Sequence, residues 1–384
     1  MKYISTFLSL SLLLATGVEA KAEAGFFKRL KKVFRSELTV GSAVLKNKGI
    51  YYGELAGRRP DGWGKVVYNN GDTYEGEFIK GSREGYGVLT TAEGTRYEGD
   101  WSNNQPSGWG SYYLINNNRY SGDWVRGNQE GEGILDYHNG DRYEGGWKQN
   151  KRSGTGTYTW ANGAKYEGEW ANDKKEGFGT IDWGDGSSYE GMWKNDARNG
   201  RGTFNYLHGD QYIGDWVNDV QHGKGIYIFH TGDRYEGGYV QGERTGKGVY
   251  LYANGDKYAG EFKDGRQEGY GIFTWANGSI YEGQWKDNNR NGKGKYTWTN
   301  GDVYEGEWVS NQPEGKGELR FADGSVYTGE FKAGLKDGQG VFVDAEGNEY
   351  RGRFEKGERH GEFQVRTADG KTTTENYVKG RRRG

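Results

Sequence analysis

The sequence has no cysteine and little proline or methionine, and these absences exclude several classes of protein. Its 384 residues include no Cys, three Pro and two Met. Without Cys there is no disulfide framework and no thiolate zinc site. So little Pro, without a Gly-X-Y period, excludes collagen, and 15% aromatic residues exclude a disordered linker. We therefore expect an ordered chain that folds without disulfides.

Long apolar runs are also missing, except for one at the N-terminus. Lys2 is followed by apolar residues 4–14 and then by small residues, which is typical of a secretory signal peptide. We predict a signal peptide over residues 1–20, with cleavage after Ala20, Ala22 or Ala24, and export to the periplasm, cell envelope or extracellular space. The alternative is an uncleaved anchor, although the run is shorter than the ~20 residues that a bilayer span needs.

Glycine is abundant, with 70 residues, and its positions reveal an internal repeat. A Tyr recurs every 23 residues, fourteen times, from Tyr51 to Tyr350. A Gly follows two residues later, a large apolar residue four later, and paired glycines eleven and thirteen later. Two clear examples are Tyr143, Gly145, Trp147, Gly154 and Gly156, and then Tyr166, Gly168, Trp170, Gly177 and Gly179. The glycine content is therefore architectural.

Alternation within the repeat predicts β-strands. From Tyr166 to Trp170, apolar residues or Gly alternate with Glu, and residues 177–183 alternate in the same way. We expect the six polar residues 171–176 to join these strands, and the Asp185-Gly186 dipeptide to close the hairpin in a tight turn. The glycines of the aromatic face would leave slots in which rings of neighbouring strands lie flat.

The unit Tyr-Glu-Gly-Glu-Trp, followed by Gly-x-Gly and Asn-Gly-Asp, resembles the MORN repeat (membrane occupation and recognition nexus). The resemblance implies an all-β fold, an elongated, single-layer, solenoid-like ribbon of antiparallel β-hairpins, with fourteen repeats over residues 51–372. It also implies a scaffold, membrane-tethering or dimerisation role. Three repeats depart from the pattern, with Leu55 for the aromatic residue, Asn117 for a turn Gly and Phe363 for the second paired Gly. End repeats of solenoids are commonly atypical.

Charge is distributed unevenly along the chain. Residues 21–50 carry a net charge of +6, residues 371–384 carry +4, and the array between them carries −12. We expect residues 373–384 to form a basic tail, with Arg381, Arg382 and Arg383 in solvent. Because the array is acidic and export is predicted, we expect no nucleic-acid partner.

The N-terminal segment, residues 21–50, includes a predicted basic amphipathic helix. Its apolar residues are Phe26, Phe27, Leu30, Val33 and Phe34. One interpretation is an interfacial helix on anionic phospholipid. The candidate lipid-binding residues are then Phe26, Phe27, Lys28, Arg29, Lys31, Lys32 and Arg35. The other interpretation is a cap that covers the open edge of the first hairpin.

The sequence offers no catalytic constellation. The five histidines are scattered, and His138 and His230 share a repeat position but lie four repeats apart. Glutamates such as Glu167 and Glu169 recur on what we take as a solvated sheet face. Single turn acids share one position of the 23-residue repeat, without the several oxygen ligands that calcium needs, at Asp72, Asp141, Asp210, Asp233, Asp256 and Asp302. We expect no enzyme activity, metal or cofactor.

The sequence thus predicts an exported, non-enzymatic repeat scaffold. Its expected partners are proteins of unknown identity and, at the periphery of a membrane, anionic lipid. The exposed face and open edges of such a sheet also suggest a homodimer. The alternative is a glycan-binding protein of the cell envelope, since aromatic faces stack on sugars.

Overall fold

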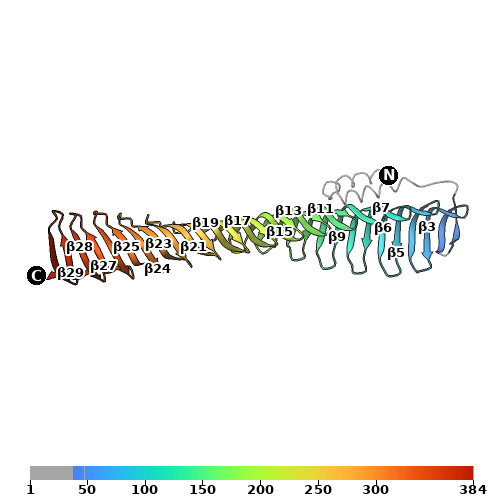
Figure 1. The fold of residues 1–384 in the computed structure, drawn as a ribbon. Coiled ribbons are helices and arrows are strands. Elements are labelled where there is room, and N and C mark those ends of the chain that lie inside the picture. Colours follow the sequence, from blue (N-terminus) through green and yellow to red (C-terminus); the bar gives the residue numbers. More distant parts are fainter. Residues whose placement is uncertain (1–37, 47, 384) are drawn as a thin grey trace, which may run out of the picture. The chain divides into compact units, whose positions relative to one another are not determined.

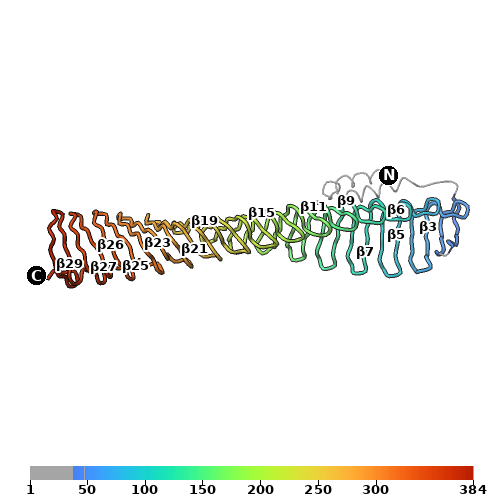
Figure 2. The backbone as a smooth tube through the Cα atoms, in the orientation of Figure 1, coloured from blue at the N-terminus to red at the C-terminus, as the bar shows by residue number. Residues whose placement is uncertain are grey.

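The computed structural model describes residues 38–46 and 48–383. These residues form strands and turns without a helix, so this part of the chain contains no helix that could cross a membrane. The chain divides into two units, residues 1–198 and 199–384. Within each unit the strands follow one another in chain order as an open sheet of one layer (Figure 1, Figure 2).

The first unit contains strands β1 to β14. Their bounds are β1 Thr39–Leu45, β2 Gly49–Ala56, β3 Arg59–Tyr68, β4 Thr73–Ile79, β5 Ser82–Thr90, β6 Arg96–Ser102, β7 Gln105–Tyr113, β8 Arg119–Val125, β9 Asn128–Asp136, β10 Arg142–Lys148, β11 Lys151–Thr159, β12 Lys165–Ala171, β13 Lys174–Asp182 and β14 Ser188–Lys194.

The second unit contains strands β15 to β31, of which β15 begins two residues before the boundary. Their bounds are β15 Ala197–Asn205, β16 Gln211–Val217, β17 Val220–Ile228, β18 Arg234–Val240, β19 Glu243–Leu251, β20 Lys257–Lys263, β21 Arg266–Thr274, β22 Ile280–Lys286, β23 Asn289–Thr297, β24 Val303–Val309, β25 Gln312–Arg320, β26 Val326–Lys332, β27 Leu335–Val343, β28 Glu349–Glu355, β29 Glu358–Arg366, β30 Thr372–Val378 and β31 Arg381–Arg383.

The predicted fold class, an all-β array of antiparallel hairpins, is confirmed. β12, for example, pairs in antiparallel fashion with β11 before it and β13 after it. In these hairpins, the glycine two residues after the repeat tyrosine lies opposite the second of the paired glycines on both neighbouring strands. Gly168 is opposite Gly179, and Gly179 is opposite Gly191 of β14. A row of glycines therefore runs across the sheet at right angles to the strands.

The predicted strand limits and turn were wrong in detail. β12 and β13 are longer than expected and use most of the six polar residues, so the tight turn is Asn172-Asp173. Both residues have positive φ, 50° and 69°, as a two-residue type I′ turn requires. The Asp185-Gly186 dipeptide lies instead in the five-residue connection between β13 and β14.

The ends of the array also differ from the predicted segments. β1 lies within the expected N-terminal segment and pairs with β2 along its whole length. At the other end, the expected basic tail contributes β30 and β31, and Arg382 forms an ion pair of 2.8 Å with Glu375. Arg381, Arg382 and Arg383 are exposed, as predicted, but they form strand β31.

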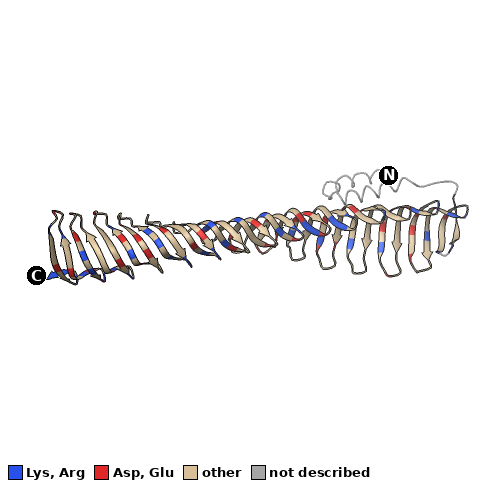
Figure 3. Cartoon of the chain, in the orientation of Figure 1, with Lys and Arg blue, Asp and Glu red and all other residues tan. Residues whose placement is uncertain are grey.

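The two faces of each sheet differ in composition. One face carries the repeat tyrosines, of which Tyr143 and Tyr166 are completely buried. The other face carries much of the charge, and Figure 3 shows acidic and basic residues distributed over strands of both units. The hydrophobic core of this fold is therefore a row of rings on one face of a single sheet.

Candidate functional site

The buried rings form an aromatic ladder, which we define as the repeat tyrosines and the large apolar residues four positions after them. Tyr166 makes edge-to-face contacts with Trp170 of its own hairpin and Trp193 of the next, at centroid distances of 5.2 and 5.5 Å. Its hydroxyl donates to the Glu169 carbonyl at 3.0 Å. Such contacts are favourable for aromatic pairs and here link each hairpin to the next.

The glycines provide the space for these rings. A Cβ on Gly179 would lie 2.4 Å from the Tyr166 hydroxyl, and one on Gly168 would lie 2.5 Å from the Gly179 Cα atom. Tyr143 covers Gly156 in the same way, and Gly145 faces Gly156. The predicted slots are therefore present, each filled by the tyrosine of the neighbouring strand.

Each tryptophan of the ladder also forms a hydrogen bond to backbone. The Trp147 indole donates to the Gly133 carbonyl at 3.2 Å, and the Trp170 indole donates to the Gly156 carbonyl at 3.1 Å. Both acceptors belong to the preceding hairpin. The tryptophans thus fix the spacing of successive hairpins as well as filling the core.

The first glycine of each pair, such as Gly154 or Gly177, has a different role. The register of β12 and β13 shifts between Gly168 and Glu169, and Gly177 in the resulting bulge has a φ of 62°. The Glu169 carboxylate accepts the Phe178 N–H there at 2.9 Å. Glu169 is therefore a structural part of the bulge, which the interpretation as a merely solvated face missed.

A row of basic side chains covers much of the ladder. We call this the basic row; it consists of the Arg and Lys residues nine positions after the repeat tyrosines. Arg83 lies 4.2 Å from the Trp101 ring centroid, Arg152 lies 4.3 Å from that of Trp170, and Lys175 lies 4.1 Å from that of Trp193. Cations over indole rings are stabilising. The other members are Arg198, Arg244, Arg290, Lys336 and Arg359.

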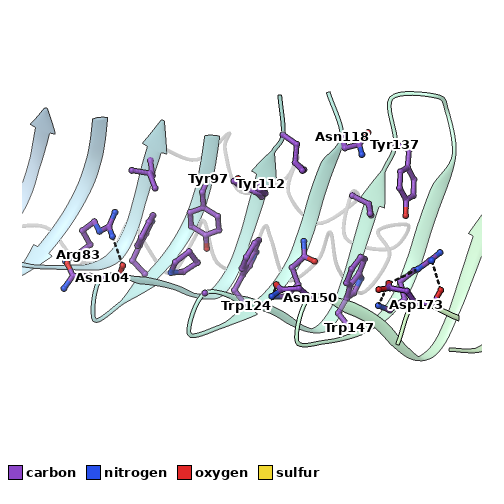
Figure 4. Close-up of a pocket in the computed structure, with 18 residues that line it drawn as sticks. Arg83, Tyr97, Asn104, Tyr112, Asn118, Trp124, Tyr137, Trp147, Asn150 and Asp173 are labelled. Carbon is purple, nitrogen blue, oxygen red and sulfur yellow. Dashed lines mark hydrogen bonds and ion pairs between the residues drawn. The ribbon is translucent and has the colours of Figure 1, made fainter. Parts of the chain in front are cut away.

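The basic row lacks a cation at six of the fourteen hairpins, and only in the first unit do two successive hairpins lack it. The equivalent positions there are Pro106 and Gln129, and no cation of the described chain lies over Trp124 or Trp147. A groove with a volume of about 640 Å³ opens at this place, and Figure 4 shows its lining side chains. We call it the ladder groove.

The ladder groove has an apolar wall and a polar wall. Leu89, Tyr112, Leu114, Leu135 and Tyr137 form the apolar wall, and all five are half-buried. The polar wall, beside the tight turns, includes Gln129 and Asn150. Within the described residues, the Tyr112 hydroxyl and the Gln129 side-chain amide have no hydrogen-bond partner. The ladder groove can therefore take an extended ligand with apolar groups and carbonyl or hydroxyl oxygens.

The ladder tyrosines themselves are not poised for acid–base chemistry. Burial raises the pKa of Tyr281 to about 12, and nearby Arg290 opposes only part of this shift. Its hydroxyl instead donates to the Gln284 carbonyl at 2.9 Å. These hydroxyls are hydrogen-bond donors at neutral pH.

The turn acids connect successive loops. Asp141 accepts hydrogen bonds from the Ala161 N–H at 2.9 Å and from the Tyr158 hydroxyl at 2.7 Å. Burial opposes its ionisation, but these bonds and one from Asn139 outweigh it and lower the pKa of Asp141. The acids therefore share one repeat position because each connects one loop to the next.

Two histidines that look scattered in the sequence are close in the second unit. The His208 and His230 rings are 5.8 Å apart and flank Asp210, with His230 Nδ1 2.7 Å from a carboxylate oxygen. Burial opposes ionisation of Asp210, but hydrogen bonds from the backbone and ring of His230 and from Tyr227 lower its pKa to about 2. The 22-residue separation, one short of the repeat, is the signal that sequence analysis missed.

The candidate lipid-binding residues lie outside the described residues. They are Phe26, Phe27, Lys28, Arg29, Lys31, Lys32 and Arg35. Their role stays a prediction.

Similar solved structures do not add a function. A SAS-4 TCP domain of Drosophila melanogaster, in complex with a proline-rich motif of Ana2, is 15% identical, with 41% of this chain and 85% of that chain covered and a TM-score of 0.28. The TCP10 domain of Danio rerio CPAP, in complex with a STIL peptide, is 10% identical, with 65% and 96% covered and a TM-score of 0.27. A Staphylococcus aureus virginiamycin B lyase is 10% identical, with 90% of each chain covered and a TM-score of 0.13.

Among curated proteins, none matches this chain in sequence. The MORN repeat family, in contrast, matches in thirteen consecutive copies. The matched residues are 74–96, 97–119, 120–142, 143–165, 166–188, 189–206, 212–234, 235–257, 258–280, 281–303, 304–326, 327–349 and 350–362. The hairpin of β2 and β3 precedes these matches and has the same geometry, since the Tyr51 ring covers Gly64. MORN repeats suggest a scaffold for protein or membrane interaction and are generally non-enzymatic. The chain belongs to the MORN repeat family.

Proposed function

We propose that this protein is an exported, non-enzymatic scaffold that binds a protein partner along the ladder groove. The observation that carries the proposal is the interruption of the basic row at Pro106 and Gln129. It leaves half-buried apolar side chains and unpaired hydrogen-bonding groups beside the ladder. Extended peptides commonly bind to surfaces that combine side-chain pockets with polar groups.

A variant that restores the basic row tests this proposal. Pro106→Arg with Gln129→Arg gives the two hairpins the residue type found at Arg83 and Arg152, so the fold should persist. We would pan a displayed peptide library on the wild-type chain and measure Kd for each enriched sequence. Enriched peptides should bind at least tenfold more weakly to the double variant. Equal binding by both proteins would refute the ladder groove as the partner site.

We further propose peripheral binding to anionic membrane through the basic N-terminal segment. Each Lys or Arg near an anionic surface contributes about 1 kcal/mol, so charge reversal at Lys31 and Lys32 should weaken binding strongly. Sedimentation of the full chain with phosphatidylserine and phosphatidylcholine vesicles, at low and physiological salt, measures this. Binding that ignores both lipid charge and the two substitutions would refute it.

Homodimerisation is a further part of the proposal and has a separate test. Each unit exposes both faces of a one-layer sheet, which is unusual for a protein that acts alone. Light scattering over a wide concentration range should give twice the mass of one chain. A monomer mass throughout that range would contradict dimerisation.

A glycan-binding role is the second candidate, and a second aromatic row supports it. Half-buried rings two residues apart on the ladder face of the second unit lie tilted against each other at centroid distances of 4.4 and 4.5 Å, as in the pairs Tyr250–Tyr252 and Phe273–Trp275. Such rings can stack on sugar faces. Retention on cell-wall polysaccharide that is lost in Tyr252→Ala and Trp275→Ala would favour this candidate over the peptide scaffold.

A further inference from the structure

An exposed apolar surface covers one end of the first unit, on the face opposite the aromatic ladder. We call it the β1–β3 patch; it consists of Val40, Val44, Ile50, Tyr52, Trp63 and Val67. Val40 and Val44 are 85% and 83% exposed, and the other four are between 42% and 52% exposed. Val44 pairs with Ile50, and Ile50 pairs with Val67, so these three form a continuous row across β1, β2 and β3.

No other described hairpin carries the whole patch, although β26 and β27 pair Val326 with Val343 at the positions of Ile50 and Val67 and have Thr328 at the position of Tyr52. At the positions of Ile50, Tyr52 and Val67, the hairpin of β12 and β13 has Lys165, Glu167 and Asp182. Lys165 pairs with Asp182 across the strands, as Ile50 pairs with Val67. The first hairpin has therefore replaced a charged pair by an apolar one. A contiguous exposed apolar surface of this kind marks an interaction site.

We infer that the β1–β3 patch is the docking site for this chain's own residues 26–35, through the face formed by Phe26, Phe27, Leu30, Val33 and Phe34. The segment ends four residues before the first residue of β1. Three connecting residues span at most about 10 Å, which equals the width of the patch across strands spaced about 4.8 Å apart. A short connection of this kind gives the segment an effective concentration of about 1 mM at the patch.

Charge favours this occupant over an anionic bilayer. Glu54 pairs with Val40, Glu77 pairs with Trp63 and Glu75 pairs with Lys65, so three carboxylates and only one ammonium group lie on the same face within and beside the patch. The carboxylates would repel anionic lipid and attract the basic side of residues 26–35. This inference is independent of the proposed function, but if both hold, the patch and the membrane compete for the same segment.

Zero-length cross-linking tests the docking. The protein is purified in the form that its host cells produce after processing. A carbodiimide joins amines to carboxylates in contact, and mass spectrometry identifies the products. We expect links from Lys28, Lys31 or Lys32 to Glu54, Glu75 or Glu77. In a mixture of isotopically light and heavy copies, these links should join residues of the same copy.

A patch variant provides the matched comparison. Ile50→Lys, Tyr52→Glu and Val67→Asp copy the residues of the β12–β13 hairpin, so the sheet should fold, as near-UV circular dichroism can verify. We expect at least tenfold fewer cross-links, and at least tenfold faster trypsin cleavage between residues 28 and 35. Ile280→Lys, an exposed residue at the Ile50 position of another hairpin, should change neither value.

Three results would overturn the inference. Unchanged cross-linking and cleavage in the patch variant would separate the segment from the patch. Links between light and heavy copies would make a second copy the occupant. Absence of these links, together with vesicle binding that the patch substitutions abolish, would make the patch a lipid-binding surface.

Discussion

The Gly127 amide donates to the Pro106 carbonyl at 2.8 Å. Pro106 donates no hydrogen bond to Gly127 in exchange, because proline has no N–H. Where the facing residue is not proline, an Asn or Asp often replaces the glycine. Asp173, for example, accepts the Arg152 N–H at 3.0 Å. All three prolines of the chain face a glycine in this way, in the pairs Pro60 with Gly81, Pro106 with Gly127 and Pro313 with Gly334.

This relationship predicts different outcomes for one substitution at two turns. Gly242 faces Gln221, which has an N–H, and a Cβ at Gly242 meets no atom closer than 3.8 Å. Gly242→Asn should therefore gain a hydrogen bond and be about 0.5–1.5 kcal/mol more stable than Gly127→Asn, because the strain of a side chain at a φ of 83° or 82° is common to both positions. Gly127→Asn should gain nothing, since Pro106 offers no donor. Urea unfolding measures both, and equal stabilities would contradict the explanation.

Alanine substitutions at two glycines of β11 should destabilise the protein for different reasons. Gly156→Ala places a Cβ 2.3 Å from the Tyr143 hydroxyl and should cost about 1–3 kcal/mol of unfolding free energy, as overpacking does. Gly154 has a φ of 82° with open space around it, so Gly154→Ala should cost about 1–2 kcal/mol through backbone strain.

A thermodynamic cycle with Tyr143→Ala separates these causes. In that background the cost of Gly156→Ala should nearly vanish, because the ring is gone, whereas the cost of Gly154→Ala should stay the same. A Gly156→Ala cost that is independent of Tyr143 would show that the slot is not what requires glycine.

The tryptophan hydrogen bonds should be measurable one at a time. Trp170→Phe leaves the half-buried Gly156 carbonyl without its indole donor, and we expect a loss of about 0.5–1.5 kcal/mol, the net contribution of one hydrogen bond. Several hairpins carry Phe at this position, so the fold should persist. Trp160→Phe, a half-buried ring outside the ladder, should change the unfolding free energy by less than about 0.5 kcal/mol. Similar losses in both variants would contradict a specific role for the hydrogen bond.

The lowered pKa of Asp210 predicts how its contribution depends on pH. A carboxyl with a folded pKa of about 2 stabilises the protein above the unfolded pKa of about 3.9, and this contribution disappears as the pH falls towards 2. Asp210→Asn should therefore destabilise the protein at pH 7 by about 1–3 kcal/mol, through its hydrogen bonds to His230 and Tyr227. The difference from wild type should shrink between pH 4 and pH 2. A constant difference over that range would contradict the assignment.

The repeat and its rings could be predicted from the sequence because fourteen tyrosines follow one another at a single spacing. The turn could not, because Asp185-Gly186 is the stronger local signal, whereas the tight turn is Asn172-Asp173. β1, β30 and β31 lack the repeat pattern and were missed for that reason. The approach of His208 to His230, and the ladder groove, depend on contacts between hairpins that a local pattern does not reveal.

The dependence of the ladder groove on one residue per repeat has an evolutionary consequence. A single codon change between Arg and Gln or Pro, nine residues after a repeat tyrosine, would extend, shorten or relocate the opening by one hairpin while leaving the backbone unchanged. Related arrays of equal length could thus diverge in ligand preference without insertions or deletions, each opening costing only the contact between one cation and the rings beneath it.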